Sequence, residues 1–597
     1  MNSYAAPLQD MRFVLEEIAG LEDLGRLPGL EDATADTVEA VLNEAGRLAG
    51  GVLAPLNRSG DVASSLYENG VVRTPAGFKE AYAAFVAGGW NAVAVPAEAG
   101  GQGLPQAIAT ATQEMWNAAN MSFALCPMLN GGALDILLHH GSAEQKALYL
   151  DKMVTGEWTG TMNLTEPQAG SDLGALKTRA VREDGHYRIQ GQKIYITYGE
   201  HDMADNIVHM VLARTPDAPA GSKGISLFIV PKFLVNPDGS LGQRNDLRCV
   251  SIEHKLGIKA SPTCVLAFGD GGGAKGWLVG QENRGLEYMF TMMNVERLGV
   301  GIQGLGLADR ALQQAIAYAK DRRQSRALGS SELQPVAIIE HADVRRNLGT
   351  MRALVEAGRA LAYAVGAAVD RSTRATDPAV RSEAGALVEV LTPVVKSWLS
   401  DMACQVASIN VQVHGGMGFI EETGAAQLYR DARILPIYEG TNGIQALDLM
   451  MRKLLRDGGQ AFGQVERWMN ALVTQAEESG EPAVTQMAAT LTHGLNRAHQ
   501  AGQWLLRNTR NDPAKAAAVA TPFLNLVGIV AGGCLMGAAA AAAARRLAQG
   551  VGDATFHRQK IKTARFYADN ILPYAEAEAR RTLEGADSML GLAPSDF

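Results

Sequence analysis

Cysteine is scarce in this chain, and the few cysteines that occur are far apart. The 597 residues contain five, Cys126, Cys249, Cys264, Cys404 and Cys534, and no two of them form a CxxC pair. This spacing argues against a zinc site, an iron–sulfur site or a disulfide framework, and it is typical of a reducing cytoplasm. We therefore expect no metal site and a cytoplasmic location.

Negatively charged residues outnumber positively charged ones, and the N-terminal stretch does not resemble a targeting signal. The net charge is -9 and the sequence pI is near 5.8, which argues against partners such as nucleic acid or anionic membrane surfaces. The N-terminal stretch MNSYAAPLQDMRFVLEEIAG lacks the apolar region of a signal peptide. The uncharged run 526–544 consists mostly of Ala and Gly, which contribute little transfer energy. We expect a buried, closely packed helix there and no transmembrane segment.

The common nucleotide and hydrolase motifs are missing. There is no GxxxxGK[ST] phosphate loop, no HExxH and no GxSxG. The stretch GGGAKG at 271–276 matches GxGxxG, but Trp277, Leu278 and Val279 continue as a strand-like run, whereas a dinucleotide site needs a helix after the glycines. We interpret this stretch as a loop. A Rossmann-type nucleotide site and a hydrolase triad are therefore not expected.

Hydrophobic periodicity divides the chain into five segments. With 47% hydrophobic residues the chain is globular, and it is too long for one core. Helical patterns dominate, but short β-rich runs between Gly, Asp and Pro turns predict a small antiparallel sheet or barrel in the middle. The expected division is an N-terminal helical extension (1–35), an N-terminal helical domain (36–155), a middle β domain (156–284), a helical domain (285–455) and a C-terminal helical extension (456–597). The predicted fold class is α+β.

One acid stands alone in an apolar run. The stretch LPIYEGTNGIQ, 435–445, places Glu439 just before Gly440 and Thr441. A surface turn accounts for this pattern. A carboxylate held in a water-poor cleft as a general base also accounts for it, because burial raises the pKa of a carboxyl group towards neutral pH. The stretch by itself leaves both interpretations open.

Other stretches carry groups suited to a flat, phosphorylated ligand. The loop LTEPQAGSD has the hydroxyls of Thr165 and Ser171, which can hydrogen-bond a planar heterocycle, although a plain connecting loop is an alternative. GQKIYITYG places Tyr195 and Thr197 on one strand face, where an aromatic side chain can equally belong to the core. The paired glycines of QVHGGMGF let the backbone approach a phosphate or simply break a helix.

Taken together and in order, these motifs resemble the acyl-CoA dehydrogenase family of flavoenzymes. The matching stretches are LTEPQAGSD, GQKIYIT, KLGIKASPT, ERLGVGIQGLG, VHGGMGF and RDARILPIYEGTNGIQ, and with the helical patterns before them they cover roughly 88–452. The terminal helical segments are similar to those of a larger-subunit branch. The resemblance implies a helical domain, a small β-barrel or sheet domain and a four-helix domain, followed by a C-terminal helical bundle. FAD would lie between the second and third domains, so no dinucleotide motif is needed.

The resemblance also assigns residues to the cofactor and the substrate. Flavin positions would be Met162, Leu164, Thr165, Gly170, Ser171, Tyr195, Thr197, Thr441, Asn442 and Gly443. The diphosphate and adenine end would meet, from a neighbouring subunit, Arg322, Gln324, Gln412, Gly415 and Gly416, which implies a homodimer or a dimer of dimers. Substrate positions would be Ser171, Asn294, Arg297 and Gly440. The chain departs from the family pattern at Gln168, at His414 and in the longer stretch after Arg322.

The implied reaction is the α,β-dehydrogenation of an acyl-CoA thioester, with electrons passed to an electron-transfer flavoprotein. The resemblance leaves the identity of the acyl group open. It includes short to long hydrocarbon chains and the 3-methylthiopropionyl group. Two alternatives use the same features. An acyl-CoA oxidase or nitroalkane oxidase has this fold with oxygen as acceptor, and a non-catalytic flavoprotein or acyl-CoA-binding scaffold would use the C-terminal bundle for interactions.

Two acids match positions that the family uses for its base. Glu439 matches the position of most members, and Glu296 in NVERLG matches an alternative position. A helical glutamate beside Arg297 is more typical of an ion pair or a surface residue. If both carboxylates share a cleft, their repulsion raises at least one pKa. We therefore expect Glu439 to be the base, with Glu296 as its neighbour or the group that tunes its pKa.

Overall fold

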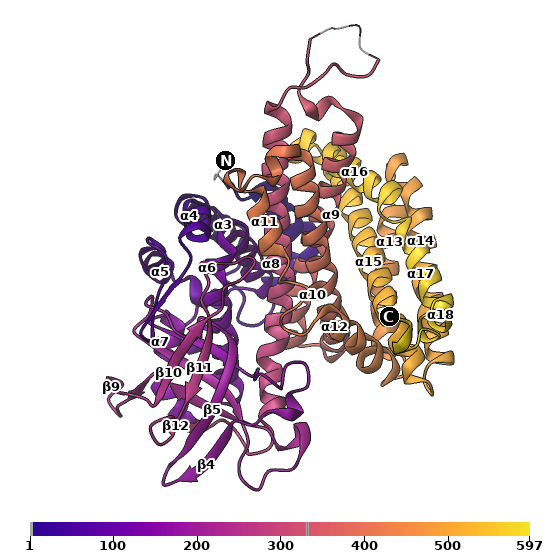
Figure 1. The fold of residues 1–597 in the computed structure, drawn as a ribbon. Coiled ribbons are helices and arrows are strands. Elements are labelled where there is room, and N and C mark those ends of the chain that lie inside the picture. The colour runs from indigo at the N-terminus through magenta and orange to yellow at the C-terminus, as the bar shows by residue number, and fades with distance from the viewer. Residues whose placement is uncertain (1–3, 330, 332–333) are drawn as a thin grey trace.

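The computed structural model describes residues 4–329, 331 and 334–597 (Figure 1). Its N-terminal layer is helical and includes one small hairpin, β1 (Leu66–Glu68) with β2 (Val71–Arg73). The α-helices of this layer are α1 (Leu8–Val14), α2 (Leu21–Leu24), α3 (Ala35–Leu48), α4 (Ala54–Ala63), α5 (Phe78–Ala87), α6 (Gln106–His140) and α7 (Ala143–Thr155).

Helix α6 bends at Asn120, and the bend sets the direction of its second half. The backbone of Asn120 is not helical, with φ -160° and ψ 89°. Its side-chain Oδ1 accepts a hydrogen bond from the backbone N–H of Phe123 at 3.1 Å, as an N-cap residue does. Its Nδ2 donates to the carbonyl of Leu53 at 3.4 Å. Asn120 therefore starts a new helical segment, which carries Gly132 against the helix of the candidate site.

The middle domain is a sheet of eight strands, in the order β10-β11-β5-β12-β7-β6-β3 with β4 paired to β5. The strands are β3 (Trp158–Asn163), β4 (Arg179–Glu183), β5 (His186–Thr197), β6 (Asn206–Ala213), β7 (Ser226–Pro231), β10 (Leu247–Ile252), β11 (Thr263–Phe268) and β12 (Ala274–Leu278), and a separate hairpin pairs β8 (Phe233–Val235) with β9 (Leu241–Arg244). The sheet differs from a purely antiparallel one, because β3 and β6 run parallel. These two strands are separated in sequence by β4 and β5, so no hairpin constrains them to be antiparallel.

Three long helices form the next layer: α8 (Gly285–Asp321), α9 (Ala342–Arg374) and α10 (Pro378–His414), followed by the short α11 (Ala425–Ala432) and α12 (Asn442–Asp448). Glycines on α8 allow α10 to come close. A Cβ atom at Gly301 would lie 2.4 Å from Val395, and one at Gly304 would lie 2.6 Å from the carbonyl of Leu399. Any larger residue would push α8 and α10 apart, and the candidate site depends on both helices.

The C-terminal layer packs on the outer face of α9 and α10 (Figure 1). Its α-helices are α13 (Gln460–Glu477), α14 (Pro482–Asn508), α15 (Pro513–Gln549), α16 (Ala554–Asn570), α17 (Tyr574–Glu584) and α18 (Ala586–Leu590). Gly528 and Gly532 of α15 lie on Trp398 of α10, since a Cβ atom at either glycine would come within 2.8 Å of the indole. The prediction of a buried, closely packed helix at 526–544 is confirmed.

Helices α6 and α15 are both long and apolar enough to cross a bilayer by length and composition. Their most apolar windows are, however, 78% and 94% buried within the protein. A buried core helix passes the same test of length and hydropathy. Neither helix is a clear membrane span.

A buried ion network joins the first and last helices to the core. Lys560 of α16 donates to Asp10 of α1 and to Glu356 of α9, both at 2.8 Å. Arg359 of α9 contacts Asp10 at 2.5 Å and also Glu114 of α6 at 2.5 Å. Each cation therefore bridges segments far apart in sequence, and the network fixes the position of α9 behind the candidate site.

Candidate active site

Glu439 lies in the turn between α11 and α12, on a strained backbone. Its φ is +55°, in the left-handed region, which costs a non-glycine residue of order 1–3 kcal/mol. Gly440 follows with φ +81°. The turn is held by hydrogen bonds on both sides: Gln445 Nε2 donates to the Glu439 carbonyl at 3.1 Å, and the Thr441 hydroxyl caps α12 by accepting from Ile444 N–H at 3.3 Å. The conformation is thus imposed by its surroundings, as is common at functional sites.

Asn442 fixes the same turn to α10. Its Oδ1 accepts a hydrogen bond from Lys396 Nζ at 2.8 Å, and its Nδ2 donates to Asp401 at 2.8 Å and to the Ser400 hydroxyl at 3.0 Å. Lys396 Nζ also donates to the carbonyl of Leu435 at 2.9 Å. The side chain of Asn442 is therefore committed to holding the Glu439 turn.

The pKa of Glu439 is raised to about 7. Burial is the main cause, and the nearby cations of Arg297 and Lys396 oppose it. Burial in turn lowers the pKa of Lys396 to about 8. Although enclosed by protein, Glu439 keeps part of its surface exposed. A carboxylate that is reachable and titrates near neutral pH has the properties of a general base.

Glu296 is a second acid beside the first, and it is not an ion-paired or surface residue as its sequence context suggested. Its side chain is fully buried, and Arg297 instead pairs with Asp448, with 3.6 Å between Nη1 and Oδ2. The pKa of Glu296 is raised well above its usual range by burial, and further by the charges of Glu439 and Asp135. The predicted repulsion between two carboxyl groups in one cleft is present, and it acts on Glu296.

Tyr438 links the turn to α8 through a short hydrogen bond from its hydroxyl to Gln303 Oε1. Arg297 Nη1 also donates to Asn294 Oδ1 at 3.3 Å, so two of the predicted substrate residues contact each other. Asn294 is exposed while Arg297 is mostly buried. They lie on the N-terminal part of α8, next to Glu296.

The loop after β3 is shaped by an acid and a lysine that sequence reasoning did not single out. Glu166 Oε1 accepts hydrogen bonds from Lys193 Nζ at 2.9 Å and from the Thr178 hydroxyl at 2.6 Å, while Oε2 accepts from Lys177 N–H at 2.6 Å. Lys193 also donates to the carbonyl of Leu164 at 2.9 Å. Burial alone would raise the pKa of Glu166, but Lys193 and these donors hold it at about 2. The sequence shows only that Glu166 lies in LTEPQAGSD and Lys193 in GQKIYIT, two motifs that were singled out for other residues.

Tyr195 stands on a β-bulge. In the β11–β5 register Cys264 pairs with Ile196 and Leu266 with Lys193, so two residues of β5 face the single residue Val265. Tyr195 has φ +60°, and its side chain is 61% exposed. Bulges re-aim side chains and are frequent beside active sites. The exposed ring is placed as a surface for a flat ligand, next to the loop that carries Thr165.

The predicted flavin residues around this bulge are brought together, and they differ in exposure. Leu164 is buried, Met162, Thr165 and Thr197 are partly buried, and Gly170 and Ser171 are exposed. The backbone N–H of Ile194 donates to the carbonyl of Thr165 at 2.9 Å, which ties the loop to β5. An exposed aromatic ring and the hydroxyl groups beside it are groups that fit an isoalloxazine ring.

The second predicted cofactor set lies elsewhere on the same chain. Its members are all exposed at the ends of α8 and α10: Arg322, Gln324, Gln412, Gly415 and Gly416. The axis of α8 covers about 39 Å between Glu296 and Arg322 at 1.5 Å per residue. A Cβ atom at Gly415 or Gly416 would have no atom within 4 Å, so this side of the backbone is open.

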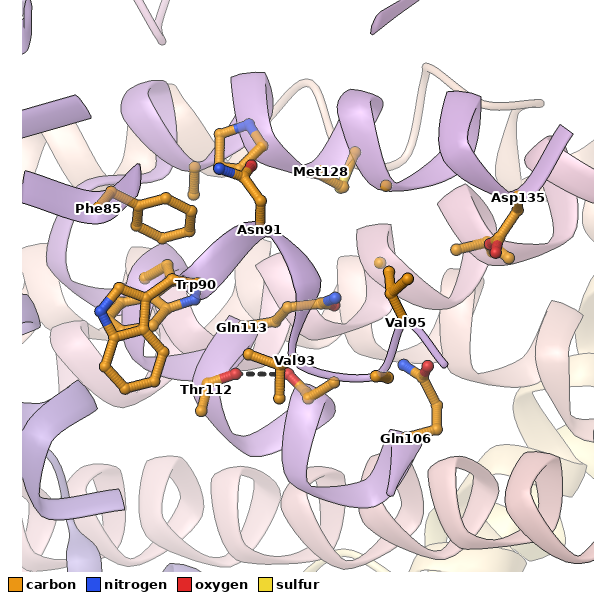
Figure 2. A pocket seen from close by; sticks show the side chains of 18 of the residues that line it. Phe85, Trp90, Asn91, Val93, Val95, Gln106, Thr112, Gln113, Met128 and Asp135 are labelled. Atoms are coloured by element: carbon orange, nitrogen blue, oxygen red, sulfur yellow. Dashed lines mark hydrogen bonds between the residues drawn. The ribbon is translucent and has the colours of Figure 1, made fainter. Parts of the chain in front are cut away.

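A cavity lies between α6, the loop before it and α8, with a volume of about 130 Å³ (Figure 2). Trp90, Val93, Met128 and Asp135 are among its lining residues. Val295 and Gly299, which flank Glu296 on α8, line it as well. The pKa of Asp135 is raised to about 6 by burial, against a smaller opposite effect of His139. The lining is mixed, because Asn91, Thr112 and Gln113 face the cavity as well, and Asp135 supplies an acidic group.

The fold and the site define an acyl-CoA dehydrogenase, and the chain belongs to that family. Four family models match it: the acyl-CoA dehydrogenase N-terminal domain at 59–157, the middle domain at 161–270, the C-terminal domain at 283–454, and an "acetyl-CoA dehydrogenase C-terminal like" domain at 461–593. The resemblance noted in the sequence motifs is confirmed. The protein is an FAD-dependent oxidoreductase of acyl-CoA thioesters.

Among its relatives, the chain is 49% identical to 3-methylmercaptopropionyl-CoA dehydrogenase of Ruegeria pomeroyi, over 98% of this chain and 99% of that protein. It is 36% identical to a butyryl-CoA dehydrogenase of Syntrophomonas wolfei, over 96% and 95% of the two chains. A solved acyl-CoA dehydrogenase complexed with FAD from Bacillus anthracis superposes with a TM-score of 0.74 at 21% identity, covering 97% of this chain and 93% of that chain. That last likeness supports the fold.

Proposed function

We propose that this chain oxidises short acyl-CoA thioesters between the α- and β-carbons, with Glu439 as the general base. The observation that carries the proposal is a reachable carboxylate with a pKa of about 7, fixed on a left-handed turn. Arg297 and Lys396 favour its ionised form, so the base is available near neutral pH. The same two cations limit how basic Glu439 is. They stabilise its carboxylate, and this attraction is lost when the carboxylate takes up the proton of the α-carbon.

FAD would be held by the middle domain of one chain and by the ends of α8 and α10 of a neighbouring chain. Tyr195, Thr165 and Thr197 would contact the flavin ring, and one FAD per chain is expected. When bound, FAD supplies the acceptor for the hydride that leaves the β-carbon. The chain's own contribution is to orient the acyl group, to exclude water and to hold the α-proton at the Glu439 carboxylate.

We infer a short acyl group from the relatives that the chain resembles. The 49% sequence identity with the 3-methylmercaptopropionyl-CoA dehydrogenase of Ruegeria pomeroyi supports the thioether substrate, and the 36% identity with a butyryl-CoA dehydrogenase of Syntrophomonas wolfei supports a butyryl group.

The assembly we propose is a homodimer or a dimer of dimers. Arg322 lies about 39 Å from Glu296 along the axis of α8, and an exposed arginine is suited to a diphosphate. A neighbouring chain would complete the site. A strictly monomeric and fully active species in light scattering would refute this part. We further propose a cytoplasmic location and an electron-transfer flavoprotein as the electron acceptor.

The test is anaerobic flavin bleaching with a panel of acyl-CoA thioesters, followed by exposure to air. A dehydrogenase should bleach with short acyl-CoA substrates and reoxidise slowly in air. Fast reoxidation of the substrate-reduced enzyme would favour an oxidase instead. A yellow protein that no acyl-CoA bleaches would favour a non-catalytic flavoprotein and would overturn the proposal.

A further inference from the structure

The carboxyl group of Glu296 has no partner within the described part of the chain. The side chain is fully buried, and neither Oε1 nor Oε2 has a hydrogen-bond partner there. The adjacent cation, Arg297, contacts Asp448 instead. A buried polar group without a partner is costly to keep, and the proton abstraction assigned to Glu439 does not use this one. Its retention indicates a partner that arrives with the substrate.

Glu296 stands at the seam between α6 and α8. Its Oε1 is 2.6 Å from the point that a Cβ atom at Gly132 would occupy, so the absence of a side chain on α6 makes room for this carboxyl group. Gly131 and Asp135, on either side of this contact, line the 130 Å³ cavity, as do Val295 and Gly299 on α8. Met128 and Asp135 both lie on α6 beside the cavity (Figure 2). The charges of Glu439 and of Asp135, which lines this cavity, both act on the carboxyl group of Glu296.

Burial without a hydrogen-bond or ion-pair partner among the described residues favours the protonated form of Glu296. The groups that act on it are Glu439 from the turn before α12 and Asp135 from α6, and both add to burial in raising its pKa. The neighbouring cations Arg297 and Lys396 act instead on Glu439. A protonated carboxylic acid has one O–H to donate, and its acceptor must come from outside the described chain.

We propose that Glu296 is a specificity-determining residue that donates a hydrogen bond to a lone-pair atom in the acyl chain, an ether oxygen or a thioether sulfur close to the β-carbon. This inference rests on the proposed function. Because the α-carbon must meet Glu439, the atoms that follow it pass the carboxyl group beside Glu439. A hydrocarbon chain leaves the O–H of Glu296 without an acceptor, whereas a heteroatom satisfies it. A site built to donate a hydrogen bond discriminates against analogues that cannot accept one.

The experiment compares three acyl-CoA thioesters of equal chain length: 3-methylthiopropionyl, 3-methoxypropionyl and pentanoyl, which differ in one atom of the chain. The readout is the ratio of kcat/KM for each heteroatom substrate to that for pentanoyl-CoA. In the unaltered enzyme the ratio should exceed one. Glu296→Leu, which has no donor, should lower the ratio about 2- to 12-fold, the range of one neutral hydrogen bond. Glu296→Gln keeps an N–H donor and should preserve most of the preference.

An unchanged ratio in Glu296→Leu would overturn the inference, because the preference would then not depend on the donor. If the leucine variant does not retain FAD, Glu296→Met provides the same loss of a donor with a flexible side chain. The pH profile for pentanoyl-CoA adds a readout that packing alone does not move. A neutral Glu296 predicts the same midpoint in Glu296→Gln, whereas a midpoint shifted downward would show that Glu296 is ionised and would overturn the inference.

Different results would contradict the proposed function and the role of Glu296. If no acyl-CoA bleaches the flavin of the unaltered enzyme, the proposed function fails and the ratio cannot be measured. If all three thioesters bleach it and the ratio is independent of residue 296, the proposed function stands and the assigned role of Glu296 fails.

Discussion

Replacing Glu439 by glutamine should abolish flavin reduction while leaving the fold intact. General base catalysis accounts for ~10²–10⁴-fold in rate, and the loss should be at or above the upper end of this range. The reason is that burial raises the pKa of the neighbouring acid, Glu296, which favours its protonated form over one that accepts the α-proton. The assay is stopped-flow bleaching without oxygen at pH 8, with FAD bound in stoichiometric amount. Glu296→Gln is the matched control and should slow bleaching only moderately.

The same substitution should stabilise the protein, with a pH dependence of known sign. The pKa of Glu439 is about 7 in the folded protein and 4.5 by default, so between these values the folded chain holds a proton that the unfolded chain releases. Stability therefore falls as pH rises through this window. At 1.36 kcal/mol per pKa unit the cost at pH 8 is about 3 kcal/mol as an upper value, because the residue is partly exposed. Glu439→Gln should unfold at a higher temperature than the unaltered protein at pH 8 and at the same temperature at pH 4.

The opposite pattern of activities would reverse the assignment of the base. If Glu296→Gln abolishes bleaching while Glu439→Gln retains it, Glu296 is the base and the assigned protonation states are reversed. The pH profile of kcat/KM gives an independent check. It should rise tenfold per pH unit below about 7 and level off above, because the ionised form of Glu439 is required.

Other substitutions test the supporting structure. Lys193→Met leaves the buried carboxylate of Glu166 without its cation, at a cost of about 3–5 kcal/mol, so the purified protein should lose FAD, measured as released flavin per chain. Arg322→Ala should weaken FAD binding without changing Glu439 chemistry, and mixing it with a chain inactivated at Glu439 should restore part of the activity through hybrid dimers; no recovery would argue against a shared site. Gly528→Leu should lower the thermal midpoint, because a Cβ atom there already lies 2.6 Å from Trp398, whereas bleaching rates should persist in the folded fraction.

The sequence carried enough information to predict the layers of the fold. Helical periodicity and β-rich runs separate cleanly along the chain, and long motifs in fixed order identify the family. The parallel pairing of β3 with β6 was not predictable, because it depends on strands that are distant in sequence. The bulge at Tyr195 was also hidden, since a register shift depends on how β5 meets β11 and not on a local pattern.

The supporting residues of the site were harder to find than the reacting ones. Glu166 and Lys193 are separated by 27 positions in the chain and meet only after the β domain folds. Neither residue type is unusual in a loop or strand, so their presence in two motifs did not show that they pair. Asn442 shows the converse, since the motif suggested a cofactor contact and the structure gives its side chain a full set of bonds to α10.

Glu439 and Glu296 illustrate why position in the fold, and not residue type, assigns acid and base. Both are glutamates with a raised pKa, and both lie at one cleft. Glu439 has two cations near it and an open side, so its pKa stops at about 7 and it can ionise when a substrate arrives. Glu296 has no exposed surface and two acids near it, so its pKa is raised well above the usual range and its protonated form is favoured. Environments that push two carboxyl groups apart in pKa give them separate roles. In the function that we propose, Glu439 removes the α-proton, and Glu296 offers an O–H to the acyl chain.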